Sequence, residues 1–185
     1  MLDDRPDIKE KLRADIVSHA PCTGTADSSS LTHESIYRMD YLAMVLKETM
    51  RVYPPFCMTG REPVEDDMLG DFRLAKGTTV VLPQLAMHRH PKWWKDPQTV
   101  IPERFSPETE GNIPEGLYFP FSLGPRKCSG HAFVDMEAKT IIAKLLPFFD
   151  VTPLNKTGNR MYPGVSLKLE KPLMAKISRN SAIKL

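Results

Sequence analysis

The most informative stretch of this chain is Phe121-Ser122-Leu123-Gly124-Pro125-Arg126-Lys127-Cys128-Ser129-Gly130. Gly124 can adopt a left-handed backbone conformation that is closed to most other residues, so it predicts a turn before the cysteine. The apolar residues after Gly130 predict a helix, whose positive N-terminal end would face Cys128 and favour the thiolate form. The stretch therefore predicts a thiolate that serves as a metal ligand or as a nucleophile.

The neighbours of Cys128 favour the metal ligand. Gly130 has no side chain, so a flat ligand could approach closely, and Arg126 offers a planar cation that suits a carboxylate. Phe121 adds an aromatic wall. Together these residues indicate a large flat cofactor with carboxylates and a metal that takes soft ligands. A nucleophilic cysteine stays open as the weaker alternative, because three histidines could serve as its base in space: His88, His90 and His131.

A second set of charged residues lies upstream. Glu48 and Arg51 are three positions apart, so they share one face of a predicted helix. They form either a surface ion pair or a buried pair, and a buried arginine would need further acceptors for its five donors. Arg104, in Pro102-Glu103-Arg104-Phe105, is a candidate to share the Glu48 carboxylate. Alternatively, Arg104 lies over the ring of Phe105.

Composition excludes several classes of protein. The 185 residues are 41% hydrophobic and 26% charged, which is typical of a globular domain. The net charge is +2 and no long run of basic residues occurs, so nothing indicates nucleic-acid binding. The three cysteines form no zinc-type pair and no disulfide framework, which favours a reducing compartment. No apolar run approaches the ~18 residues needed to span a bilayer.

Periodicity predicts three helices. The first runs from Arg5 to about Ser18, and a surface loop from His19 to Ser30 follows it. The second runs from Asp40, a plausible N-cap, to Val52 before two prolines. The third follows Gly130, ends at Pro147 and is apolar on nearly every side, so we expect it to be buried.

The remaining segments predict short strands and irregular structure. Met68 to Leu74 and Thr78 to Leu82 are two strand candidates, joined by a turn at residues 75–77. Residues 83–125 are rich in proline and aromatic residues without periodicity, and such long stretches are usually functional. The tail from Val151 to about Ile177 predicts short strands, with turns at 155–159 and 163–164. The expected fold class is mainly α with a small β component.

Three motifs resemble those of the cytochrome P-450 family, the haem-thiolate monooxygenases. Phe121-x-x-Gly124-x-Arg126-x-Cys128-x-Gly130 is similar to the family's haem-binding signature, Glu48-Thr49-Met50-Arg51 to its ExxR motif, and Pro102-Glu103-Arg104-Phe105 to its PERF motif. They occur in the family's order and at about its spacing. The resemblance implies that residues 1–185 are the C-terminal haem-binding portion of a single domain. The family's central helix and distal pocket would then lie upstream of Met1.

The resemblance implies roles for individual residues around haem b. Cys128 would be the axial iron ligand, Arg126 and Arg61 would bind the propionates, and Phe121, Gly124 and Gly130 would shape the cofactor site. Glu48, Arg51 and Arg104 would form a triad that holds the cysteine loop. Six residues would fall beside the substrate: Phe56, Cys57, Met58, Thr59, Met161 and Tyr162.

The implied activity is insertion of one oxygen atom into a small apolar substrate, with electrons from a redox partner such as an NADPH-dependent reductase. A cluster of basic residues is either a solvated surface or a dock for an acidic reductase: His88, Arg89, His90, Lys92 and Lys95. A eukaryotic microsomal member would lie at the endoplasmic reticulum membrane. Two alternatives stay open, a truncated non-catalytic haem-binding remnant and a haem-thiolate isomerase or dehydratase.

Overall fold

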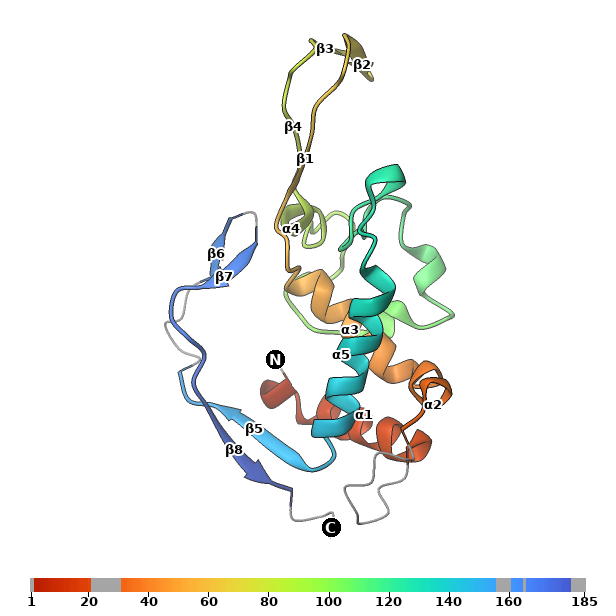
Figure 1. Ribbon diagram of the computed structural model, residues 1–185, viewed down its shortest axis with the longest axis vertical. Helices are drawn as coiled ribbons and strands as arrows, with labels where there is room; N and C mark the ends of the chain where they lie inside the picture. The colour runs from red at the N-terminus through yellow and green to blue at the C-terminus, as the bar shows by residue number, and fades with distance from the viewer. Residues whose placement is uncertain (1, 21–30, 156–160, 165, 181–185) are drawn as a thin grey trace.

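A computed structural model describes residues 2–20, 31–155, 161–164 and 166–180 of the chain (Figure 1). Its helices are α1 (Pro6–His19), α2 (His33–Tyr37), α3 (Asp40–Val52), α4 (Gln84–Met87) and α5 (His131–Leu145). The strands are β1 (Thr59–Arg61), β2 (Asp67–Leu69), β3 (Phe72–Leu74), β4 (Val80–Leu82), β5 (Phe149–Pro153), β6 (Met161–Pro163), β7 (Leu167–Leu169) and β8 (Ala175–Arg179). The prediction of a mainly α fold with a small β component is confirmed. No described helix has both the length and the apolar character needed to cross a bilayer.

The main core lies between α1 and α3. Ile8, Leu12 and Ile16 recur every fourth residue, so they form one buried face of α1, as the sequence predicts. They pack with Leu42 and Val45 of α3 in one cluster of buried side chains. This contact fixes α3, which carries the Glu48 and Arg51 side chains.

The start of α3 differs from the prediction. Asp40 is the first helical residue rather than the N-cap, and the N-cap is Met39, which makes no capping hydrogen bond through its side chain. The amide of Leu42 instead donates to the Asp15 carboxylate of α1 at 3.1 Å. A residue 27 positions away therefore satisfies a first-turn donor that usually needs a local cap. The short helix α2, which Thr32 caps through a reciprocal bond with Ser35, was not predicted.

The predicted pairing in the central hairpin is wrong. Met68 to Leu74 is not one strand, because the chain reverses at Gly70 (φ +60°) and forms the two strands β2 and β3. The turn at Lys76-Gly77 exists, but β4 pairs with β1 rather than with the strand before that turn. The result is a small hairpin at the tip of a longer one, which projects from the helices (Figure 1).

Helix α5 is far less buried than its composition predicts. Lys139 and Ala143 are its only buried residues, whereas Phe133, Val134, Ile141 and Leu145 are exposed. The helix packs on α2 and α3 along one side, and much of its other side is exposed. An apolar sequence is compatible with burial on all sides, but burial also requires neighbours on all sides. Leu146 caps the helix at its C-terminus and Pro147 follows, as predicted.

The irregular stretch and the tail are both ordered by short elements. Within residues 83–125 the chain forms α4 and three single 3-10 turns, Pro102–Phe105, Glu110–Asn112 and Gly124–Arg126. In the tail, β5 pairs with β8 and β6 pairs with β7, both antiparallel. These strands confirm the β prediction for the tail. Residues 156–159 of the first predicted turn lie outside the described residues.

Candidate functional site

The cysteine loop closes on itself before α5 begins. The amide of Cys128 donates to the carbonyl of Phe121 at 2.9 Å, and Lys127 N donates to Gly124 O at 3.0 Å. Gly124 has a φ of +71°, so the left-handed turn predicted at this position exists. Ser122 also has a positive φ of 63°, which is uncommon for a residue with a side chain. Two left-handed residues, separated by the extended residue Leu123, thus bring Cys128 back beside Phe121.

The Cys128 thiol is free and exposed at the N-terminus of α5. A methyl group added at Gly130 would lie 3.9 Å from the sulfur, so the glycine keeps the space beside the sulfur open. The other described free thiol, Cys57, is buried, and burial raises its pKa. Cys128 is therefore the accessible thiol among the described residues. No described cluster of three or more His, Cys, Asp or Glu side chains could hold a metal ion by itself.

Two guanidinium groups lie on or beside this loop. Arg61 of β1 donates to the Ser122 hydroxyl at 2.7 Å and to its neighbour's carbonyl, Gly60 O, at 2.8 Å. Arg126 is exposed and makes no hydrogen bond or ion pair within the described part of the chain. Phe121 stacks at an angle on His131, with ring centroids 6.2 Å apart. An exposed thiol, an open glycine and two planar cations fit a flat metal cofactor that carries carboxylates.

Glu48 and Arg51 form a fully buried ion pair. Both side chains are 0% exposed, and Arg51 donates to the two carboxylate oxygens at 2.7 Å and 2.9 Å. Its remaining donors reach three backbone carbonyls, His88 O, Pro97 O and Thr99 O. The surface alternative is excluded, and the further acceptors that a buried arginine requires are all backbone groups.

Arg104 is the third member of this cluster. Its Nε lies 3.4 Å from Glu48 Oε1, and its Nη2 donates to the carbonyls of Lys95 and Asp96. Ile101 N also donates to Glu48 Oε1, at 2.8 Å. Burial lowers the pKa of Arg104, an effect that the Glu48 charge opposes. The structure therefore brings the three predicted triad residues together around one carboxylate.

His88 connects this cluster to the cysteine loop, a role that the sequence did not predict. Its carbonyl accepts from Arg51, and its ring Nε2 accepts from Phe119 N at 3.0 Å. Gln84 holds the other backbone group of Phe119, because its side chain donates to Phe119 O at 2.7 Å. Both side chains are buried, and desolvation lowers the pKa of His88 to about 4. Phe119 lies two residues before Phe121. Arg51, His88 and Phe119 therefore connect the triad to the cysteine loop through hydrogen bonds.

The predicted basic cluster divides into buried and exposed parts. His88 does not belong to a solvated surface, because the ring is fully buried. Arg89 is half-buried, donates to Val52 O and lies over the ring of Tyr53. His90, Lys92 and Lys95 are exposed. Only these last three residues form a surface that could meet an acidic partner.

The first predicted substrate-lining segment lies beside β7, which pairs with the strand β6 that carries Met161 and Tyr162. Phe56 pairs with Ser166 in an isolated bridge, and Leu167 N donates to Pro55 O at 2.9 Å. Phe56, Met58, Met161 and Tyr162 are exposed, whereas Thr59 is half-buried. The side chain of Cys57 is buried, so it is not accessible to a ligand from the surface. The backbone carbonyl of Cys57 accepts a hydrogen bond from Leu85 N.

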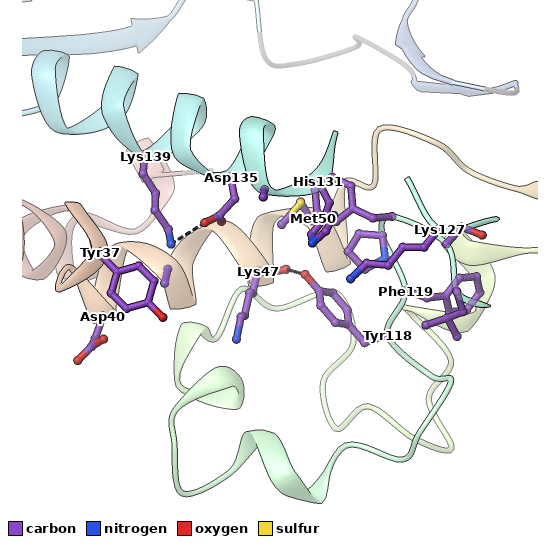
Figure 2. Close-up of a pocket in the computed structure, with 16 residues that line it drawn as sticks. Tyr37, Asp40, Lys47, Met50, Tyr118, Phe119, Lys127, His131, Asp135 and Lys139 are labelled. Carbon is purple, nitrogen blue, oxygen red and sulfur yellow. Dashed lines mark hydrogen bonds and ion pairs between the residues drawn. The ribbon is translucent and has the colours of Figure 1, made fainter. Parts of the chain in front are cut away.

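A pocket of about 610 Å³ lies against the cysteine loop, and sequence reasoning missed it (Figure 2). Phe121, Ser122 and Leu123 form part of its wall, and α3 and α5 supply other parts. Two polar links are visible in Figure 2: Lys139 pairs with Asp135 at 2.7 Å, and Tyr118 donates to Lys47 O at 2.9 Å. Burial raises the pKa of Tyr118. None of the predicted substrate residues lines this pocket.

Comparison with known proteins places these features in a family. A family model for cytochrome P450 matches residues 1–177. The chain is 35% identical over 180 residues to cytochrome P450 3A41 of Mus musculus, covering 93% of this chain and 34% of that protein. It is 32% identical over 185 residues to cytochrome P450 3A31 of Mesocricetus auratus, covering 99% of this chain and 36% of that protein. The chain spans about a third of the length of these relatives, and it belongs to the cytochrome P450 family of haem-thiolate monooxygenases.

Proposed function

We propose that this chain binds haem b through the Cys128 thiolate and forms the ligand side of a monooxygenase site. The observation that carries the proposal is the exposed thiol of Cys128, in a loop that closes beside the open Gly130. The buried cluster around Glu48 supports the same loop through His88 and Phe119. A rigid loop matters because supporting contacts must hold a metal-ligating side chain in one geometry.

Each of the residues around Cys128 would make a different contact with the cofactor. Arg126 is free to pair with a propionate, and Arg61 would pair with the second. The positive end of α5 would lie beside the bound sulfur and complement its negative charge. When bound, haem would supply the oxygen chemistry of the reaction. Glu48, Arg51 and Arg104 would act only by positioning.

The exposed surfaces support a proposal for the substrate and for the redox partner. Phe56, Met58, Met161 and Tyr162 offer apolar contacts, which suit a small apolar substrate. His90, Lys92 and Lys95 offer a basic surface for an acidic, NADPH-dependent reductase. We further propose the endoplasmic reticulum membrane as the site of the enzyme, by analogy with microsomal members of the family.

Haem reconstitution tests the ligand assignment. We expect the chain with added haem, once reduced and exposed to carbon monoxide, to show the absorption shift of a thiolate-ligated iron. Cys128→Ala should abolish this shift, because it removes the accessible thiolate. Cys57→Ala is the matched control, since Cys57 is buried, and it should retain the shift. A thiolate signal that survives Cys128→Ala would overturn the assignment.

One observation favours a second candidate, a haem-binding remnant without catalysis. The exposed apolar residues of α5 show that the described chain leaves a wide surface uncovered, as a remnant would. Turnover separates the two functions. The reconstituted chain, supplied with a reductase and an apolar substrate, should oxidise the substrate if it is an enzyme. A thiolate signal without turnover would favour the remnant.

A further inference from the structure

Two buried side chains of one helical turn hold both backbone polar groups of Phe119. Gln84 opens α4 and His88 is its C-cap residue, so the two lie four positions apart on the same face. The Gln84 amide donates to Phe119 O at 2.7 Å, and Phe119 N donates to His88 Nε2 at 3.0 Å. Gln84 is 1% exposed and His88 is fully buried. We call this pair of contacts the Phe119 clamp.

Only one half of the Phe119 clamp can titrate. Because Nε2 of His88 accepts from an amide, the proton of the neutral ring lies on Nδ1. A second proton would lie on Nε2 and point at the N–H of Phe119, so two donors would face each other and the contact would be lost. The Gln84 amide does not titrate, so its contact with Phe119 O persists in acid.

The groups around the His88 ring disfavour its protonated form. Desolvation is the main cause that lowers its pKa to about 4, the Arg51 charge acts in the same direction, and the Met50 carbonyl opposes them. Glu48 offers no free negative charge, because Arg51 already pairs with both of its oxygens. The Tyr118 ring lies 5.2 Å from the His88 ring, and burial raises the pKa of Tyr118, so the phenol stays neutral in acid. The elements around the ring therefore favour expulsion of an imidazolium.

The Phe119 clamp lies at the start of the cysteine loop. Phe119 O accepts from Ser122 N at 3.0 Å, and two residues further on Phe121 O accepts from Cys128 N at 2.9 Å. We propose that the clamp is an acid-sensitive contact: a proton on His88 releases Phe119 N, and the cysteine loop opens while α1 and α3 stay folded. The consequence for haem ligation by Cys128 rests on the function proposed above.

The expected size of the effect follows from the linkage between protonation and opening. In the closed loop the pKa of His88 is about 4, and an open loop returns the ring to water and to the ordinary value of 6.5. The equilibrium constant for opening then rises about twentyfold between pH 7 and pH 5, because the open form takes up the proton and the closed form does not.

Hydrogen exchange of single amides, followed by NMR, tests the opening in the 185-residue chain without haem. We expect the protection factors of Phe119 N and Cys128 N to fall about twentyfold between pH 7 and pH 5. Urea below the unfolding transition separates local from global opening. It should lower the protection of Leu12 N in α1 and leave that of the two loop amides unchanged, because a local opening exposes little surface.

Three variants assign the effect to the Phe119 clamp. His88→Gln offers an oxygen that accepts from Phe119 N without titrating, so the protection of the loop amides should be the same at both pH values. His90→Gln is the matched control on an exposed histidine, and it should keep the twentyfold fall. Gln84→Leu removes the half that does not titrate, so it should lower the protection by about fivefold at both pH values.

The haem-loaded chain tests the consequence for Cys128. Its reduced carbon monoxide complex should lose the thiolate absorption at pH 5 and regain it on return to pH 7, whereas His88→Gln should keep the absorption at both. A chain that shows no thiolate absorption at pH 7 would contradict the ligand assignment alone, because hydrogen exchange reports on the loop without haem.

Three outcomes would overturn the acid-sensitive contact. One is equal protection of Phe119 N and Cys128 N at pH 7 and pH 5, and another is a fall in protection that His88→Gln retains. The third is a response of both loop amides to urea that is as steep as that of Leu12 N, because the loop would then open only when the whole chain unfolds.

Discussion

Arg51 shows how one side chain can organise a loop-rich region. All five of its N–H donors have acceptors, two on Glu48 and three on backbone carbonyls of residues 88, 97 and 99. The guanidinium also lies over the Trp94 ring, with Cζ 5.0 Å from the centroid. Because these carbonyls belong to a stretch with little regular structure, a single arginine supplies the order that a sheet or helix would otherwise provide.

Removal of Arg51 should therefore be among the most damaging single substitutions. We expect Arg51→Leu to lower the free energy of unfolding by about 3–5 kcal/mol, because it leaves the Glu48 carboxylate buried without its partner. Urea unfolding measures the change. Arg38→Leu is the control, since Arg38 and Glu34 form an exposed pair, and it should cost less than about 1 kcal/mol. Equal losses in the two variants would contradict the buried role of Arg51.

His88 gives a pH dependence of known sign. Its folded-state pKa of about 4 lies below the ordinary value of 6.5, so the unfolded chain binds the proton more tightly. The stability that neutral His88 contributes is complete above pH 6.5 and is lost as the pH falls towards 4. We expect a loss of about 2 kcal/mol between pH 7 and pH 5 from this residue.

The measurement for His88 is a difference between variants. His88→Gln should unfold with a smaller change between pH 7 and pH 5 than the parent chain, since glutamine does not titrate. His90→Gln, which alters an exposed neighbour, should leave the change as it was. Carboxylates with a lowered pKa, such as Asp66, act below this range and do not obscure it. An unaltered pH response in His88→Gln would show that the histidine does not titrate as described.

At the scale of elements, the cysteine loop depends on backbone conformation more than on packing. Gly124 has a φ of +71°, yet a methyl group added there would meet nothing within 4 Å. The glycine is therefore required for its backbone angle and not for space. The same holds for Gly70 and Gly77, which turn the nested hairpins at φ +60° and +83°.

We expect Gly124→Ala to lower stability by about 1–2 kcal/mol through left-handed strain alone. The strain should also move Cys128, so the haem-reconstituted variant should show a weaker thiolate signal. Gly111→Ala is the control, because Gly111 has open space and no positive φ. Thermal unfolding and the carbon monoxide spectrum measure the two effects. A normal spectrum in Gly124→Ala would separate the turn from the position of the ligand.

At the scale of the whole molecule, charged contacts join β5 of the C-terminal strands to α1. Asp150 of β5 accepts from Lys9 at 2.5 Å and from Arg13 at 2.7 Å, and both of these belong to α1. These partners hold the pKa of Asp150 below its ordinary value of 3.8. In Figure 1 the strands form an arc beside the helices rather than a layer on them.

Asp150→Asn should loosen the arc and leave the helical core intact. We expect faster cleavage of the tail in limited proteolysis, with little change in the unfolding of the α1–α3 core. The parent chain should show the same loosening as the pH falls below 3.8, because protonation of Asp150 removes the same attraction. Asp71→Asn, on an exposed residue of the hairpin, is the control. Equal cleavage rates would mean that other contacts hold the strands.

The sequence by itself determined the family, the candidate ligand Cys128 and the positions of the three long helices. Spaced motifs and a period of 3.6 residues are local properties, so α1 and α3 could be predicted closely. The tertiary structure alone decided that His88 is buried, that β4 pairs with β1, and that α5 is exposed along one face. Burial and strand pairing depend on which distant segments meet, and a linear pattern of apolar and charged residues does not contain that information.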